Sequence, residues 1–218
     1  AALRALAQRI GPRRLIWRYD PLFLARSLRG ELPELDPAFH LENFRRLAQA
    51  LEGTTRRVVV SLLDEYRFTG TRLARAGYAE PSYGSPRLRD EAAGEPTIPP
   101  ALLELLRSIG DIARDRGMEA RSCAEPALLA AVGIAPGACI DGRLITELFG
   151  SPRLGQSELF ETTEPESRAG LPPPKAEGLP QPGKRDPGQR RGCGCAPSVD
   201  IGDYGACPTG CVYCYARR

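Results

Sequence analysis

Long apolar runs, a secretion signal and a strong net charge are all missing from this sequence of 218 residues. No apolar run is long enough to cross a membrane, and the chain does not open with a basic stretch followed by an apolar one. We therefore expect a cytoplasmic protein without membrane partners. The net charge of +3 is too small to indicate a nucleic-acid footprint. Nucleic acid remains open as a partner, although no feature of the sequence supports it.

Methionine is also scarce, since it occurs only at Met118 and the chain does not begin with it. Residues 1–10 have the pattern of the middle of an amphipathic helix, with Leu3, Leu6 and Ile10 on one apolar face. From these two observations we expect the chain to be a fragment of a longer protein.

A glycine-rich phosphate loop is the last notable absence. Strands are predicted over 14–20, 57–63, 118–123 and 138–141, and helices over 37–51, 99–116, 125–132 and 142–149, with a polar loop over 77–97. This alternation predicts an α/β fold with a parallel sheet. Because no phosphate loop follows a strand, a partial or permuted (β/α) TIM-barrel-like fragment is favoured over a doubly wound sheet.

Three regions of different composition follow one another along the chain. Residues 1–150 contain the strand and helix repeats. Residues 151–190 are rich in proline and glycine and cannot bury enough apolar surface to fold, so we predict a linker or disordered insert. Residues 191–218 form a cysteine-rich loop, which we interpret as an iron–sulfur loop.

Polar residues follow the predicted strands at the edge where barrel enzymes build their active sites. Arg18, Asp20, Asp64 and Glu125 are the catalytic candidates at this edge. The alternative is that each is a cap or turn residue, because the end of a strand meets water in any fold. His40, the sole histidine, falls near the start of a predicted helix, where we expect a solvent-facing or capping role.

The most informative motif lies near the C-terminus, where Cys207, Cys211 and Cys214 have Cys-x3-Cys-x2-Cys spacing. Three thiolates can hold three irons of a 4Fe-4S cluster and leave the fourth iron open to a small molecule. The motif resembles that of radical S-adenosylmethionine enzymes, in which the open iron binds S-adenosylmethionine. That resemblance implies that Tyr213 lies against the adenine; the alternative is a packing aromatic. Zinc ligands or buried thiols are the alternatives for the cysteines.

Four further cysteines make a second set. Cys193 and Cys195 project to the same side of an extended chain, and Cys123 and Cys139 lie at the ends of neighbouring predicted strands. A four-thiolate set suits a second iron–sulfur cluster or a structural zinc, and we favour iron–sulfur. Two alternatives stay open: Cys123 and Cys139 are small buried apolar residues, or one of them donates a hydrogen atom to a substrate radical.

Blocks along the chain resemble those of a bacterial family called domain of unknown function 1848 (DUF1848). They are Ile16–Pro21, His40 with Phe44, Ser61–Tyr66, Ser122–Glu125, Cys139–Asp141, Gln189–Arg190, and the cysteine-rich run from Cys193 to Ala216. The resemblance links the chain to radical enzymes such as spore photoproduct lyase through the terminal cysteines. Those barrels carry the cysteine loop after their first strand, whereas here it comes last, so either the barrel is permuted or the cluster serves another purpose. The insert at 151–183 departs from the family.

The leading hypothesis is an enzyme of unknown substrate that reductively cleaves S-adenosylmethionine, with flavodoxin or ferredoxin as reductant. The alternative is a non-catalytic protein that binds zinc or a closed iron–sulfur cluster.

Overall fold

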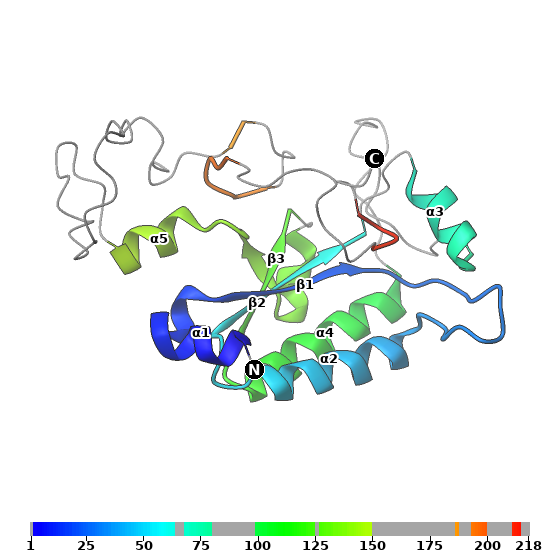
Figure 1. Ribbon diagram of the computed structural model, residues 1–218, viewed down its shortest axis with the longest axis horizontal. Helices are drawn as coiled ribbons and strands as arrows, with labels where there is room; N and C mark the ends of the chain where they lie inside the picture. The colour runs from blue at the N-terminus through cyan, green and yellow to red at the C-terminus, as the bar shows by residue number, and fades with distance from the viewer. Residues whose placement is uncertain are drawn as a thin grey trace, which may run out of the picture.

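The computed structural model describes residues 2–63, 68–79, 99–124, 127–149, 186–187, 193–199 and 211–214. Its central layer is a parallel sheet, and helices α2 and α4 cover one face of that sheet (Figure 1). Helix α5 and the segment 193–199 lie on the opposite side (Figure 1). The predicted insert at 151–190 lies outside the described residues, apart from 186–187.

The sheet has four strands in the order β1-β2-β3-β4, and every neighbouring pair is parallel. Their bounds are Ile16–Leu22 for β1, Arg57–Leu62 for β2, Glu119–Cys123 for β3 and Ala135–Gly137 for β4. Val58, Val59 and Val60 of β2 are all buried, as a β-branched run at the centre of a parallel sheet requires. The parallel α/β architecture expected from the sequence is confirmed.

Two long helices supply the main core. Helix α2 spans Pro37–Leu51 and begins at Asp36, whose carboxylate accepts a hydrogen bond of 2.7 Å from the Phe39 N–H. Helix α4 spans Pro100–Asp115 and packs against α2. Its buried positions recur at helical spacing, so one apolar stripe faces the sheet: Leu102, Leu105, Leu106, Ile109, Gly110 and Ala113.

Several elements differ from the prediction. Strand β1 continues through Pro21 to Leu22, and its pairing with β2 shifts after Tyr19. Proline is tolerated there because β1 is the edge of the sheet that the described residues form and need not donate on both sides. The predicted strand over 138–141 lies earlier, at β4, because Ala135–Gly137 pairs with β3. Helix α3 (Thr69–Ala76) was not predicted.

The remaining helices are short. α1 spans Ala2–Ile10, the 3-10 helix η1 spans Pro12–Arg14, η2 spans Ala127–Val132 and α5 spans Gly142–Phe149. The apolar face predicted for α1 is not buried, since Leu3 is 47% and Leu6 is 42% exposed. Within the described residues, α1 instead buries Ala7. A helix was predicted over 125–132, and the structure has the 3-10 helix η2 within that range.

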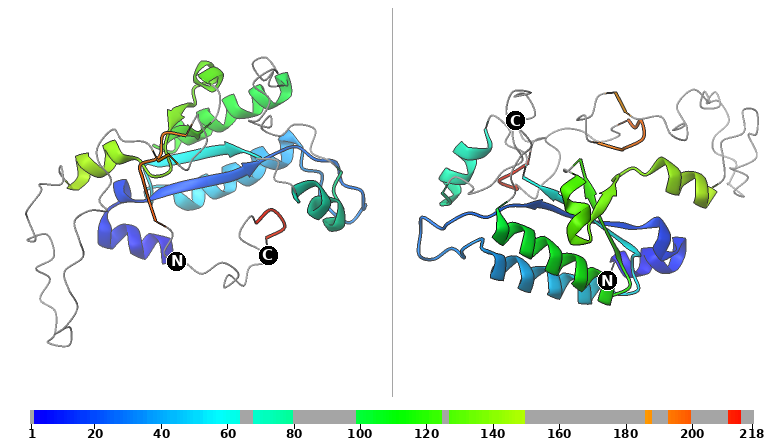
Figure 2. Two further views of the ribbon diagram at one scale, coloured as in Figure 1. Left: turned by 90° about the horizontal axis from the view of Figure 1, so that it is seen from above. Right: turned by 180° about the vertical axis from the view of Figure 1, so that it is seen from behind.

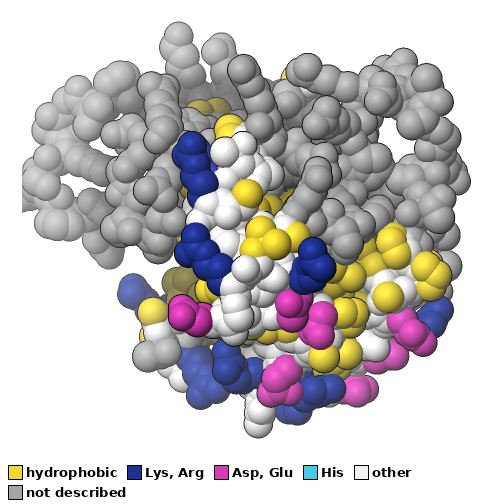
Figure 3. All heavy atoms as spheres, turned by 90° about the vertical axis from the view of Figure 1, so that its right-hand side faces the viewer, with side chains coloured by type: hydrophobic (Ala, Val, Ile, Leu, Met, Phe, Trp, Pro, Cys, Tyr) yellow, Lys and Arg dark blue, Asp and Glu magenta, His cyan; other side chains and the backbone are white. Residues whose placement is uncertain are grey.

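The two faces of the sheet differ in character. Successive side chains of a strand point to opposite faces of the sheet, and those of Tyr19, Val58 and Val60 lie in the core under α2 and α4. The opposite face carries charged side chains, among them Arg18 and Arg57, together with Cys123. The side of the molecule shown in Figure 3 mixes basic, acidic and apolar side chains, without a continuous basic surface among the residues described there. None of the described helices combines the length and apolar character needed to span a membrane.

Candidate metal centre

Two neighbouring strands bring Cys123 and Cys139 together. Cys123 is the last residue of β3 and pairs in register with Gly137, the last residue of β4. Cys139 follows two residues later. Because the strands are parallel and adjacent, their carboxyl ends meet at one edge of the sheet, as the sequence predicts.

The segment 193–199 adds the other two cysteines of this set. The Ala196 N–H donates a hydrogen bond of 2.9 Å to the Ile140 carbonyl, and the Asp186 N–H donates one of 2.9 Å to the Cys195 carbonyl. These bonds hold the extended segment across the end of β4. Cys193 and Cys195 are 3% and 7% exposed and belong to one buried cluster with Cys123.

The sulfur atoms converge on a common point. The Sγ atoms of Cys123, Cys139 and Cys195 all lie within 4.8 Å of one another, so these three cysteines could hold a metal ion. Cys193 packs in the same cluster, and its Sγ accepts a hydrogen bond of 3.4 Å from the Cys195 N–H. The Ile140 N–H donates to the Cys195 Sγ at 3.5 Å. We call Cys123, Cys139, Cys193 and Cys195 the cysteine centre.

The thiol groups of these neighbouring cysteines differ in pKa. Hydrogen bonds with Cys139 and Cys195, together with burial, raise the pKa of Cys123 far above its ordinary value. The hydrogen bond with Cys123 lowers the pKa of Cys139, but the one with Cys195 and burial outweigh it and raise that pKa to about 11. Hydrogen bonds from Cys123 and Cys139 lower the pKa of Cys195 far below its ordinary value. Cys195 is therefore the cysteine of the group that loses its proton most easily, and a cation that binds must displace the protons that remain on the others.

Arg18 is the positive charge beside the cysteine centre. It lies opposite Val59 in the sheet, and Val59 packs directly against the buried cysteines. Its Nη2 pairs with the Asp20 Oδ2 at 2.5 Å. Burial lowers the pKa of Arg18, but the charges of Cys139, Asp20, Cys123 and Cys195 outweigh that effect and raise it. Two of the four catalytic candidates thus lie near the centre.

A second ion pair connects the sheet to α5. The Arg57 Nη1 donates to the Asp141 Oδ2 at 2.6 Å, and Asp141 Oδ1 accepts from the N–H groups of Arg143 and Leu144 at the start of α5. Burial raises the pKa of Asp141, but the bonds from Leu144 and Arg57 lower it overall. Asp141 therefore fixes α5 just past Cys139. No motif in the sequence signals Arg57 as its partner.

The terminal cysteines lie elsewhere. Cys211 and Cys214 form a turn in which the Cys214 N–H donates to the Cys211 carbonyl at 3.1 Å. Arg72 of α3 donates a hydrogen bond of 2.6 Å to the Cys214 carbonyl, a contact that the sequence does not signal. Both views of Figure 2 show this turn beside α3 and away from the segment 193–199. The six described cysteines thus fall into two groups, four in the cysteine centre and two in the terminal turn, whereas Cys207 lies outside the described residues.

Other predicted site residues have mixed outcomes. Cys207, Asp64 and Glu125 lie outside the described residues, and Tyr213 is half-buried in the terminal turn. His40 is neither solvent-facing nor a cap: it is 5% exposed, with Nε2 2.7 Å from the Phe23 carbonyl oxygen and Nδ1 3.1 Å from the Tyr19 hydroxyl oxygen. The prediction for His40 was wrong because α2 turns that residue toward β1.

Comparison with known proteins identifies a family without a known activity. The model of a family described as "Domain of unknown function (DUF1848)" matches residues 1–216. No curated protein and no solved structure matches the chain.

Proposed function

The chain belongs to the DUF1848 family, and we propose that it is a metalloprotein with two sulfur-ligated centres. The first is a closed site formed by the cysteine centre. The second is an open site on Cys207, Cys211 and Cys214. The observation that carries the first is the convergence of three largely buried sulfurs within 4.8 Å at the edge of a parallel sheet.

The cysteine centre has the properties of a closed metal site. Its four donors are all sulfur, which zinc and iron–sulfur clusters both accept. A tetrahedral ion with Zn–S bonds of about 2.3 Å separates its sulfurs by about 3.8 Å, so a single ion fits with small adjustments. An iron–sulfur cluster would require the sulfurs to move apart. The N–H groups of Ile140 and Cys195 that point at sulfur would orient the ligands.

Metal analysis tests this centre. The full chain, purified without oxygen, should contain one zinc or one iron–sulfur cluster bound by the cysteine centre. Cys123→Ser and Cys195→Ser should each abolish that binding, whereas Cys211→Ser is the matched control and should retain it. Full metal content in both Cys123→Ser and Cys195→Ser would contradict the proposal. The short sulfur separations favour a single zinc ion. Zinc without a brown chromophore would favour a non-catalytic role.

For the open centre we propose a radical S-adenosylmethionine-type reaction. Cys207, Cys211 and Cys214 would hold a 4Fe-4S cluster there, which would supply one electron, taken from a flavodoxin or ferredoxin, for the cleavage of S-adenosylmethionine to methionine and an adenosyl radical that removes a hydrogen atom from a substrate. The Cys-x3-Cys-x2-Cys spacing supports this role. The contact from Arg72 would hold the loop in place. Arg18, Asp20, Asp64 and Glu125 are the proposed substrate contacts.

The product of the reaction separates this proposal from the first. Reconstituted and reduced full-length protein should release 5'-deoxyadenosine from S-adenosylmethionine, and Cys211→Ala should release none. A cluster that loads on the terminal cysteines without yielding 5'-deoxyadenosine would rule out the radical reaction and leave the closed centre untouched.

We also infer that the sheet is part of a (β/α) barrel. Two observations support it: the strands follow one another in sequence order, and the crossover helices α2 and α4 cover the same face. The face that carries Arg18 and Cys123 would then be the interior of the barrel.

A further inference from the structure

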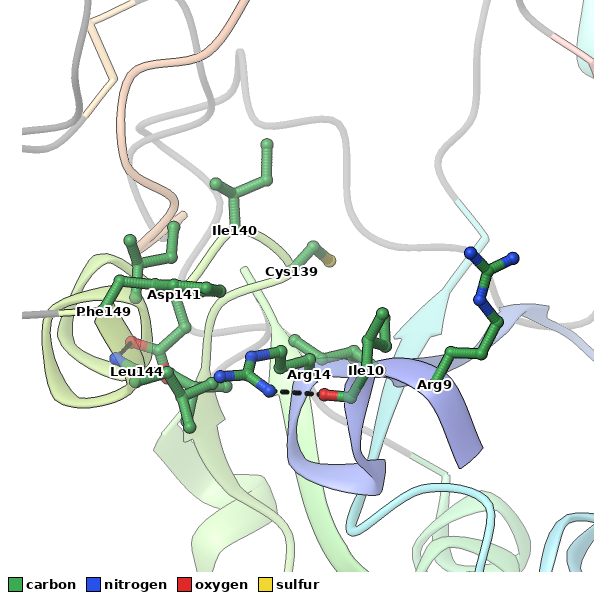
Figure 4. A pocket seen from close by; sticks show the side chains of 11 residues that line it. Arg9, Ile10, Arg14, Cys139, Ile140, Asp141, Leu144 and Phe149 are labelled. Carbon is green, nitrogen blue, oxygen red and sulfur yellow. Dashed lines mark hydrogen bonds between the residues drawn. The ribbon is translucent and has the colours of Figure 1, made fainter. Parts of the chain in front are cut away.

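A cavity of about 580 Å³ lies beside the cysteine centre, between the α1–η1 segment and α5. Its wall is mainly aliphatic and aromatic, and it includes Cys139, Arg9 and Arg14 (Figure 4). The volume falls in the range of about 300–1,000 Å³ that is typical of small-molecule sites. A molecule in this cavity would therefore lie next to one member of the centre.

Specific contacts hold the two sides of the cavity together. Arg13 of η1 forms an ion pair with Glu147 of α5. The Arg14 guanidinium lies 5.1 Å from the centroid of the Phe149 ring, at the end of α5. Figure 4 shows Arg14 between Leu144 on one side and Ile10 on the other. The cavity is thus bounded by helices that contact each other directly.

The charge of the cavity is positive. Within the described residues, no carboxylate pairs with Arg9 or Arg14; the hydrogen bond of Arg14 goes to the Ile10 carbonyl at 2.5 Å. Asp141 is the acidic residue in the wall, and Arg57 neutralises it at 2.6 Å. Two guanidinium groups are therefore free of carboxylate partners beside an apolar wall. Such groups favour carboxylate or phosphate oxygens as ligands.

We propose that this cavity binds a small amphipathic anion whose carboxylate or phosphate group is attracted by the positive charge of Arg9 and Arg14, whose guanidinium groups extend in different directions (Figure 4). Its apolar body packs on the side chains of Ile10, Ile16, Leu144, Ile145, Leu148 and Phe149. Binding does not require a particular metal at the cysteine centre, because neither arginine and none of these apolar residues is one of its four cysteines.

Calorimetric titration of the full chain tests the site with octanoate and octyl phosphate as probes. At least one should bind in a 1:1 ratio, and the tighter of the two identifies the preferred anionic group. Octan-1-ol, which lacks the charge, and inorganic phosphate, which lacks the apolar body, should each bind at least tenfold more weakly. Equal binding of octan-1-ol, or no binding of either anionic probe, would overturn the proposal.

Variants on α1 and η1 locate the site. Arg9→Gln and Arg14→Gln should each lower the affinity for the tighter-binding probe about fivefold to tenfold. Arg4→Gln is the matched control, because Arg4 lies on the same helix but contacts the Ala50 carbonyl and does not line the cavity. Arg9 is exposed and its side chain makes no hydrogen bond to the described residues, so Arg9→Gln should fold normally, as circular dichroism can verify. Unchanged affinity in Arg9→Gln and Arg14→Gln would contradict this location.

Discussion

At the scale of single residues, Arg18 is a positive charge that acts on the cysteine centre. A bound metal with four thiolates carries net negative charge, which a guanidinium nearby stabilises. We expect Arg18→Gln to weaken metal binding about tenfold, which corresponds to about 1.4 kcal/mol. Arg18→Lys should recover most of this loss, because it keeps the charge. Competition with a coloured zinc chelator measures the affinities.

The half-exposed position of Arg18 provides a control within the same experiment. Salt screens charges that face water, so the difference between wild type and Arg18→Gln should shrink as ionic strength rises. Identical affinities at low salt would show that Arg18 does not act on the centre.

His40 should make stability depend on pH. Burial lowers the pKa of His40 from its usual 6.5, although the Phe23 carbonyl and Asp36 act in the opposite direction. The unfolded chain therefore takes up a proton at a higher pH than the folded chain does. The neutral form contributes stability above about pH 6.5, and this contribution is lost as pH falls below that value, by at most about 1.4 kcal/mol per pH unit.

Urea unfolding at a series of pH values checks the effect of His40. His40→Gln should be less stable at pH 7.5 by about 1–3 kcal/mol, because buried hydrogen bonds are lost. It should also lose less stability than wild type between pH 6.5 and 5. Parallel pH curves for the two proteins would contradict the assignment.

The cysteines and His40 illustrate which features of the site could be predicted from the sequence. The gathering of four cysteines in the cysteine centre could be predicted from the sequence. Cys123 and Cys139 lie at the ends of neighbouring strands, and Cys193-Gly-Cys195 presents two sulfurs on one side. The burial of His40 was not, because it depends on contacts with Tyr19 and Phe23 made across the fold. The cavity was equally hidden, since its wall combines residues near 10 and near 145.

At the scale of elements, strand β4 has no room for a side chain at Gly137. A Cβ atom on Gly137 would lie 2.7 Å from the Cβ of Arg121 on β3, closer than such atoms approach. We expect Gly137→Ala to cost about 1–3 kcal/mol of stability and to weaken metal binding, because Cys139 follows two residues later. Denaturant unfolding and metal titration measure both effects.

Gly30 supplies the matched control. A Cβ on Gly30 would meet no atom within 4 Å, so Gly30→Ala should leave stability and metal binding unchanged. If Gly137→Ala behaves in the same way, β3 and β4 are not packed as closely as described here.

Local sequence explains which elements were predictable. Helix α2 has an N-cap, a first-turn proline and an apolar stripe, and its predicted bounds are confirmed. Strand β4 has the sequence Ala135-Pro136-Gly137, which has low strand propensity, so pairing with β3 determines it. The apolar face of α1 obeys helical periodicity yet stays exposed, because periodicity does not say whether a neighbour covers the face.

At the scale of the whole molecule, the cysteine centre joins residues far apart in sequence, so a bound metal should stabilise the fold. A ligand that binds only the folded state at 100 times its dissociation constant adds about 2.7 kcal/mol. For a chain of this length, that corresponds to a rise in Tm of roughly 5–10 °C. Differential scanning fluorimetry with and without a chelator measures the shift.

The chelator experiment has its own control. Cys195→Ser should show no metal-dependent change in Tm, whereas Cys211→Ser should respond like the wild type. A metal-dependent shift that survives in Cys195→Ser would place the stabilising metal elsewhere.

The order of the strands has a consequence for how the chain is made. A ribosome releases the four strands in the same order in which they lie side by side, so each can join the edge left by the one before it. Cys195, however, is synthesised long after β4. If the centre binds a metal ion as proposed, the nascent chain cannot offer the complete set of donors until this late segment has emerged.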